Sequence, residues 1–168
     1  MYIETDRMIV RDFTVHDLSD LHEILGDGET MKYCEPAYTV RKTADFLQSF
    51  CIDKKGAFAA VHKESSKVIG YILFHATDDG VYEMGWIFNQ NYRGKGLASE
   101  ACGAVVDYAF DRMHVHKIFA ETIDGGRSVN LMKKLGMKPE GIQRSQVRDN
   151  FGNWVDVYLY GILAQDRP

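Results

Sequence analysis

A strand that runs into a glycine-rich, basic loop and then into the longest apolar-striped helix is the feature that most constrains this chain. Residues 81–89 read as a strand, residues 93–96 as the loop, and residues 97–113 carry apolar side chains at helical spacing. The first N–H groups of a helix lack intrahelical partners and lie at the positive end of its dipole. Glycines let an anion approach that backbone closely. The junction therefore predicts a phosphate-binding site made of Arg93, Gly94, Lys95, Gly96, Leu97 and Ala98.

Two familiar nucleotide-binding loops do not fit this junction. A Walker A loop needs Ser or Thr after its lysine, and Lys95 is followed by Gly96. A dinucleotide-binding loop needs a third glycine where Ser99 stands, and an acidic residue at the end of a second strand about 20 residues on. The strand before the loop also belongs to an antiparallel meander, whereas both of those loops follow a strand of a parallel sheet. The sequence therefore favours another kind of phosphate ligand.

The other hydrophobic patterns predict strands alternating with helices. The helices are expected at residues 14–25, 43–52, 97–113 and 128–135, the last one ended by Gly136. The strands are expected at residues 8–13, 57–62, 68–75, 81–89, 117–123, 138–148 and 154–163. This order predicts an α/β (α+β) fold, with helices packed on a mixed, mostly antiparallel sheet.

Composition and charge limit the function classes. Hydrophobic residues make up 45% of the 168 residues and charged residues 26%, as in one globular domain over residues 1–168. The three scattered cysteines, a charged N-terminal segment and the lack of a membrane-length apolar run together predict a cytoplasmic protein. A net charge of −4 argues against a nucleic-acid partner. No grouping of His, Cys, Asp or Glu has metal-ligand spacing, so no metal site is predicted.

The junction also carries a family resemblance. The residues Arg93-x-x-Gly96-x-Ala98 resemble the Q/R-x-x-G-x-G/A signature of the GNAT superfamily, the Gcn5-related N-acetyltransferases. Segments 4–11, 83–88 and 128–137 resemble, in the same order, the ribosomal-protein N-terminal acetyltransferase branch of that superfamily. The resemblance implies a sheet of about seven strands, splayed between the fourth and the fifth, with helices on both faces.

The resemblance further implies acetyl-CoA as the cosubstrate. Its pyrophosphate is expected on the glycine-rich loop, and its pantetheine arm in the splay, where it pairs like an extra strand with the backbone of Trp86, Ile87 and Phe88. A backbone N–H of this strand would face the thioester oxygen. The acetyl group then passes directly to the amine, so no enzyme nucleophile is required.

Two side chains are candidates for proton transfer. Glu83 matches the position where many relatives carry a general base; the alternative is a solvated strand residue. Ser128 matches a serine of the ribosomal-protein branch that could assist the leaving thiolate, and it could also be the N-cap of its helix. The family's more usual donor, a tyrosine, is replaced by Met132, and its usual asparagine by Gly125. Asn130 is the candidate to replace that asparagine as a cofactor contact.

The acceptor is expected to be a primary amine. The branch resemblance favours a protein or peptide α-amine, and small amines such as polyamines, amino acids or aminosugars stay open, as does an acyl-CoA-binding module without catalysis. Loops 27–40 and 149–153 are expected to frame the acceptor opening, and His75 either lines it or is structural. A monomer or a homodimer is expected.

Overall fold

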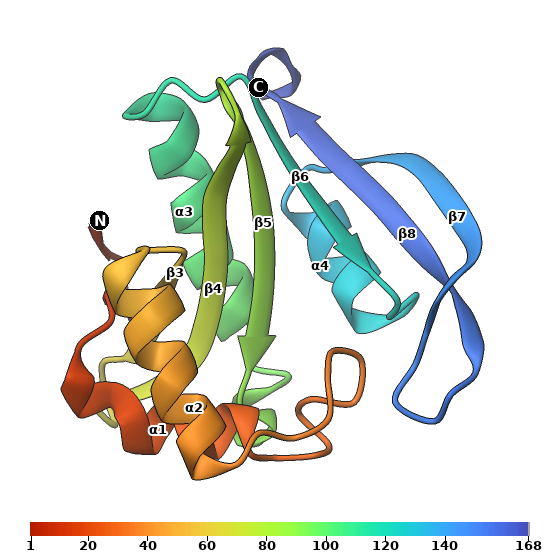
Figure 1. Cartoon of the computed structure of the whole chain (residues 1–168). Helices are drawn as coiled ribbons and strands as arrows, with labels where there is room; N and C mark the ends of the chain where they lie inside the picture. The colour runs from red at the N-terminus through yellow and green to blue at the C-terminus, as the bar shows by residue number, and fades with distance from the viewer. Residues whose placement is uncertain (168) are drawn as a thin grey trace.

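One eight-stranded sheet organises the computed structural model, which describes residues 1–167; Pro168, the last residue of the predicted domain, lies outside the described residues. The strand order is β1-β2-β3-β4-β5-β6-β8-β7, and every neighbouring pair is antiparallel except β5–β6 (Figure 1). The strands are β1 Tyr2–Glu4, β2 Met8–Asp12, β3 Ala57–His62, β4 Lys67–Asp78, β5 Val81–Phe88, β6 Lys117–Thr122, β7 Lys138–Arg148 and β8 Trp154–Leu163. The predicted fold class is confirmed, with β1 as the strand that the hydrophobic pattern did not predict.

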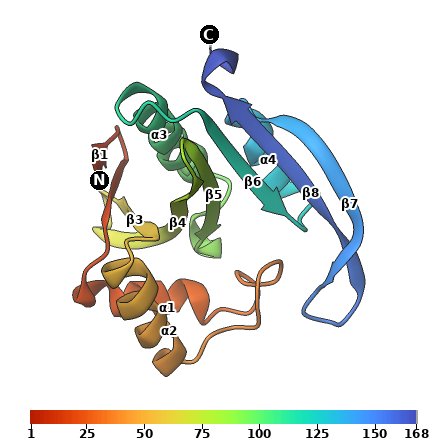
Figure 2. The same ribbon diagram turned by 45° about the horizontal axis from the view of Figure 1, so that its top comes forward.

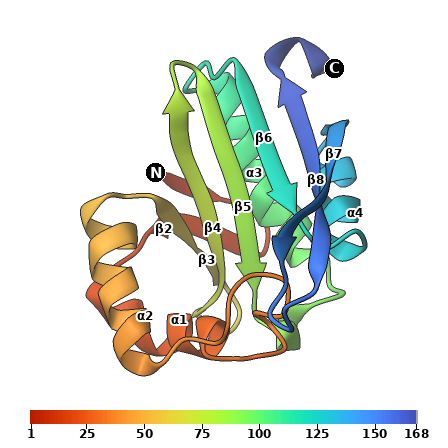
Figure 3. The ribbon, with the colours of Figure 1, turned by 45° about the vertical axis from the view of Figure 1, so that its right-hand side comes forward.

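Helices cover both faces of the sheet, as Figure 2 and Figure 3 show. The pairs α1 (Leu18–Leu25) with α2 (Val40–Phe46) and α3 (Leu97–Asp111) with α4 (Arg127–Lys134) lie on opposite sides. The alternation of strand side chains explains the two cores, because neighbouring residues of a strand point to opposite faces. Ile72 and Phe74 of β4 join the core under α3, whereas Tyr71 joins the core under α1 and α2.

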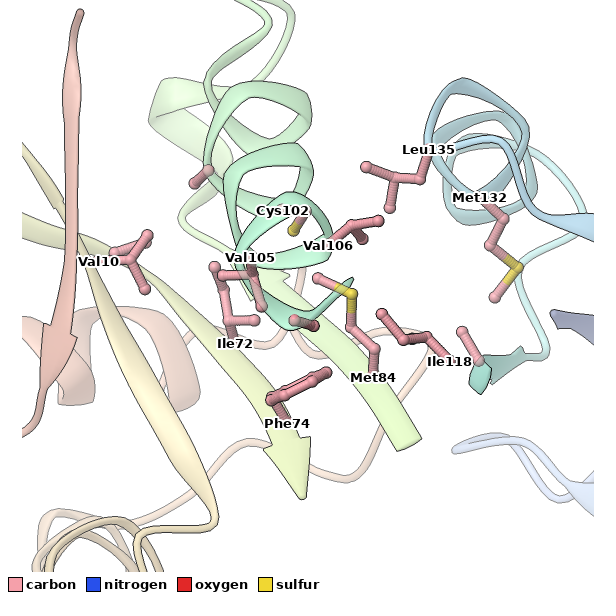
Figure 4. Packing of buried hydrophobic residues seen from close by; sticks show 14 of the residues in the cluster. Val10, Ile72, Phe74, Met84, Cys102, Val105, Val106, Ile118, Met132 and Leu135 are labelled. Carbon is pink, nitrogen blue, oxygen red and sulfur yellow. The ribbon is translucent and has the colours of Figure 1, made fainter. Parts of the chain in front are cut away.

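The core under α3 holds the helix that begins at the glycine-rich loop. Cys102, Val105 and Val106 of α3 face Ile72 and Met84 of the central strands (Figure 4). All five side chains are at most 4% exposed. Since buried side chains are close-packed, the start of α3 is held at a defined place beside the end of β5.

Strands β5 and β6 pair over only three positions and then separate. Val81, Tyr82 and Glu83 pair with residues 117–119, whereas residues 84–88 of β5 pair only with β4. Residues 120–122 of β6 pair only with β8. The splay between the fourth and fifth predicted strands is therefore confirmed. It exposes one backbone edge of β5 beyond Glu83.

Element bounds differ from the predictions at all four helices. The helix expected at residues 14–25 is a 3₁₀ turn, Val15–Asp17, followed by α1 from Leu18, and α3 ends at Asp111, two residues before its predicted end. The helix expected at residues 43–52 begins at Val40, because the hydroxyl of Thr39 caps it by accepting from Lys42 N–H at 3.2 Å, and it continues as a π-helix, Leu47–Asp53. The helix expected from Ser128 begins at Arg127. Gly136, with φ of +81°, follows α4 as predicted, since a left-handed residue commonly ends a helix.

Candidate active site

The loop between β5 and α3 has the backbone shape of an anion site. Gly94 and Gly96 both adopt left-handed φ values, +78° and +77°, which side chains with a Cβ rarely tolerate. Gly96 is the N-cap of α3 and brings no side-chain acceptor of its own. A Cβ built on Gly94 would meet nothing within 4 Å, so the space beside this backbone is open. The first N–H groups of α3 are thus available to a ligand.

A cavity of about 400 Å³ begins at this loop and continues to the splay between β5 and β6. Its walls come from the end of β5, the loop, the start of α3, helix α4 and the loop after α1. The structure brings together most of the residues that the sequence singled out, since the cavity is lined by Trp86, Ile87, Phe88, Arg93, Gly94, Gly96, Leu97, Ala98, Ser128 and Asn130.

Lys95 is not among the residues that line this cavity. Its Nζ lies 5.6 Å from the centre of the Tyr92 ring, and its carbonyl accepts a hydrogen bond from Arg7 Nη1 at 2.9 Å. The second cation of the cavity is Arg127 instead, the first residue of α4, and Lys134 also lines the wall. Sequence reasoning missed Arg127, although its place directly before the family-like segment 128–137 was a usable signal.

Arg93 and Arg127 form a positive wall. Burial, and then the nearby charge of Arg127, lower the pKa of Arg93 below its usual value. An anion bound beside both guanidinium groups would offset the cost of holding them together. This donor set, two guanidinium groups and the N–H groups at the start of α3, suits a pyrophosphate.

Ser128 is not the N-cap of α4, so the alternative prediction that Ser128 caps this helix is wrong. The N-cap is Gly126, and the buried carboxylate of Asp124 accepts from the N–H groups of Gly126 at 2.9 Å and Ser128 at 3.1 Å. A carboxylate offers several lone pairs, so it can satisfy both donors. The Ser128 hydroxyl, which also donates to Asp124 at 3.3 Å, lines the cavity.

Glu83 stands where the two strands begin to separate. It is the last residue of β5 that pairs with β6, three residues before Trp86. Its Oε2 lies 3.2 Å from Nε2 of His75, its partner on β4, and the two side chains are 27% and 37% exposed. Glu83 is not among the residues that line the cavity. The cavity wall takes residues 86–88 of β5, and Glu83 precedes them on the same strand.

The two loops expected to frame the acceptor opening meet. Asn150 Nδ2 donates to the carbonyls of Met31 at 3.3 Å and Lys32 at 3.4 Å, which joins the β7–β8 turn to the loop after α1 (Figure 3). The neighbouring residues Tyr33 and Cys34 line the cavity. The bridge between the loops therefore lies close to one wall of the cavity.

Position 125, where the family usually has asparagine, is glycine here, and Tyr158 leaves little room for a side chain. A Cβ at this position would lie 3.1 Å from the hydroxyl oxygen of Tyr158, and the ring atoms are nearly as close. Tyr158 occupies the space into which a larger side chain would extend. Asn130 lines the cavity, whereas Gly125 does not.

Comparison with known proteins agrees with this geometry. Residues 7–138 match the family model described as the acetyltransferase (GNAT) domain. The uncharacterized N-acetyltransferase YnaD of Bacillus subtilis is 34% identical over 99% of both chains. The ribosomal protein uS5-alanine N-acetyltransferase of Escherichia coli is 26% identical over 98% of this chain and 91% of its own length.

Solved structures show the same fold. A GNAT-family acetyltransferase from Bacillus anthracis superposes with a TM-score of 0.90 at 31% identity, covering 98% of this chain and 99% of its own. A spermidine N-acetyltransferase from Vibrio cholerae, solved with CoA and spermine, superposes with a TM-score of 0.83 at 21% identity, covering 96% and 98%.

Two properties of residues 1–167 complete the description. None of their helices has the length and apolarity needed to cross a membrane. Within the same residues, no three His, Cys, Asp or Glu side chains are grouped so as to hold a metal ion.

The family-model match, the full-length relatives and the splayed sheet with its glycine-rich loop together show that this chain belongs to the GNAT family and is an N-acetyltransferase that resembles the ribosomal-protein branch.

Proposed function

We propose that this protein transfers the acetyl group of acetyl-CoA to the α-amine at the N-terminus of a protein or peptide. The observation that carries acetyl-CoA as the acetyl donor is the continuous cavity that runs from the positive loop at α3 to the splay at β5. It suits a cosubstrate with a doubly charged pyrophosphate at one end and an extended, amide-containing arm at the other. Residues 1–168 would act as one domain, in the cytoplasm, as a monomer or a homodimer.

The pyrophosphate is assigned to the N–H groups of residues 94–98, with Arg93 and Arg127 adding positive charge. The pantetheine arm would pair with the open backbone edge of β5 at Trp86, Ile87 and Phe88. An N–H group of that edge would donate to the thioester oxygen, where negative charge develops as the amine attacks. This requires an edge that no neighbouring strand occupies, and β5 has one beyond Glu83.

Glu83 is assigned as the base that takes the proton of the attacking amine, directly or through water. Its position at the point of separation supports the assignment, because an arm that enters along β5 would bring its thioester toward this point. The side chain is partly exposed, so an amine or a water molecule can reach its carboxylate. His75, in contact with Glu83, would lie on the acceptor side.

Ser128 is assigned to the leaving thiolate, to which its hydroxyl would donate after turning away from Asp124. Because Asp124 and not Ser128 caps α4, replacing Ser128 with alanine should barely change the melting temperature. Turnover should fall about tenfold, roughly 1.4 kcal/mol, since water can also protonate a thiolate. The measurements are steady-state kinetics and thermal melting.

Asp124→Ala is the matched control for Ser128→Ala. It removes the acceptor of both N–H groups and should cost about 0.5–2 kcal/mol of stability, as for a lost N-cap. If Ser128→Ala keeps full activity, the hydroxyl has no role in the reaction. If it melts as early as Asp124→Ala, its contribution is structural.

The acceptor is tested by following the release of free CoA thiol with a panel of amines. We expect short peptides with a free α-amine to be substrates and the same peptides with a blocked N-terminus to be inert. The uS5-alanine N-acetyltransferase of Escherichia coli, similar over most of this chain, supports this choice. The spermidine enzyme shares the fold and motivates polyamines as the competing class.

Three other results would change the proposal. A kcat/KM that is higher for spermidine or spermine than for every peptide would make the protein a small-amine acetyltransferase. Turnover of amino acids or aminosugars alone would do the same. Tight CoA binding without CoA release from any amine would indicate a binding module that does not catalyse transfer.

A further inference from the structure

Arg7 connects the phosphate-binding loop to the first turn of α3 without lining the cavity itself. It lies in the turn between β1 and β2. Its Nη1 donates to the carbonyl of Lys95 at 2.9 Å, and its Nε donates to Glu100 Oε2 at 2.7 Å. Its backbone N–H donates to the other carboxylate oxygen of Glu100 at 2.8 Å. One residue thus holds two elements that are about 90 residues away in the sequence.

The carbonyl that Arg7 holds lies between the two left-handed glycines. In a trans peptide the carbonyl and the following N–H point in opposite directions. With the Lys95 carbonyl turned to Arg7, the N–H of Gly96 is directed away from Arg7. Gly96 lines the cavity and Arg7 does not, so an N–H directed away from Arg7 is available to a ligand there. Release of the carbonyl would let this peptide plane rotate.

Glu100 completes the arrangement. It accepts from the Thr5 hydroxyl at 2.6 Å as well as from Arg7, and its side chain is 19% exposed. Burial alone would raise the pKa of Glu100, but the hydrogen bonds from Thr5 and Arg7 outweigh it and lower that pKa. Glu100 is therefore a fixed negative charge in the first turn of α3. By charge alone it opposes an anion at this helix start.

We propose that Arg7 and Glu100 are positioning residues that hold the 93–96 loop in its anion-binding shape before acetyl-CoA arrives. The inference rests on the proposed pyrophosphate site and goes beyond it, because neither Arg7 nor Glu100 is among the residues that line the cavity. A preorganised loop spares the ligand the free energy of ordering it. The role predicts an effect on affinity for phosphate-containing ligands and little effect on the chemical step.

Four variants test the clamp, which we define as the Arg7–Glu100–Lys95 carbonyl contacts. Arg7→Met should weaken CoA binding about tenfold in calorimetry, because the loop then has to be ordered on binding. It should raise the KM for acetyl-CoA by a similar factor with kcat nearly unchanged. For acetyl-pantetheine, which has no phosphates, kcat/KM should stay as in the unchanged protein.

Arg7→Lys and Glu100→Gln separate the clamp from simple charge. Lysine keeps the positive charge but not the planar fork that reaches both Glu100 and the Lys95 carbonyl. The affinity of the Arg7→Lys variant for CoA should therefore fall nearly as far as that of Arg7→Met. Glu100→Gln removes a negative charge near the anion. Electrostatics alone predicts tighter CoA binding for this variant, whereas the clamp predicts weaker binding.

Lys63→Met is the matched control. Lys63 pairs with Glu4 at 2.6 Å beside the same β1–β2 turn and does not contact the loop, so CoA affinity should be unchanged even if the melting temperature falls. Full affinity in Arg7→Lys, or tighter binding in Glu100→Gln, would overturn the clamp while leaving the proposed function intact. If the protein without any substitution binds no CoA, both the clamp and the proposed function are overturned.

Discussion

Replacing Glu83 with glutamine should lower kcat by about 10²- to 10⁴-fold, the usual contribution of a positioned base, with little change in the KM for acetyl-CoA. Glutamine keeps the size and hydrogen-bonding reach of the side chain but cannot take a proton from the amine. Because Glu83 lies at the point where β5 and β6 separate, outside the residues that line the cavity, cosubstrate binding should not depend on it. Steady-state kinetics with a peptide acceptor and acetyl-CoA measures both effects.

Glu121→Gln is the control for this experiment. Glu121 is an exposed carboxylate of β6, the strand on the other side of the splay, and no role in the reaction is assigned to it. Its variant should turn over normally. If Glu83→Gln raises only the acceptor KM, Glu83 binds the acceptor and is not the base. An unchanged rate would make Glu83 an ordinary solvated residue of the strand.

Replacing Gly96 with valine should abolish measurable CoA binding, with a loss of at least about 100-fold, or roughly 2.7 kcal/mol. Two effects combine: the side chain occupies the approach of the phosphates, and a β-branched residue resists the φ of +77°, so the N–H groups no longer converge. A Cβ at this position meets only the end of Arg7, at 3.6 Å, so no clash within the protein forces unfolding. Calorimetry with CoA measures the loss.

Gly152→Val is the control for backbone strain as such, without a change at the phosphate-binding loop. Gly152 has φ of +83°, and a Cβ there meets nothing within 4 Å, so valine at 152 carries the backbone strain at a position in the β7–β8 turn. Both variants should lose some stability, and only Gly96→Val should lose CoA binding. Equal CoA affinities in the two variants would place the pyrophosphate elsewhere.

The amino-acid sequence by itself predicted the elements that local patterns encode. The apolar spacing of residues 97–113 predicted α3, which the structure has as Leu97–Asp111, and the two glycines before it predicted a helix start open to an anion. The antiparallel meander of β3, β4 and β5 followed from alternation and turn residues. These features depend on neighbours a few residues apart, where backbone preference and side-chain period act directly.

The tertiary structure alone decided which distant residues complete the site. Arg127 and not Lys95 provides the second charge of the cavity wall, and Asp124 and not Ser128 caps α4. The contact of Asn150 with the Met31 carbonyl joins residues 119 positions apart, and that of Arg7 with the Lys95 carbonyl joins residues 88 positions apart. Such contacts depend on strand order and on how the helices pack across the sheet. A single sequence carries no local pattern for either, because a side chain's direction is known only once the sheet that carries it is formed.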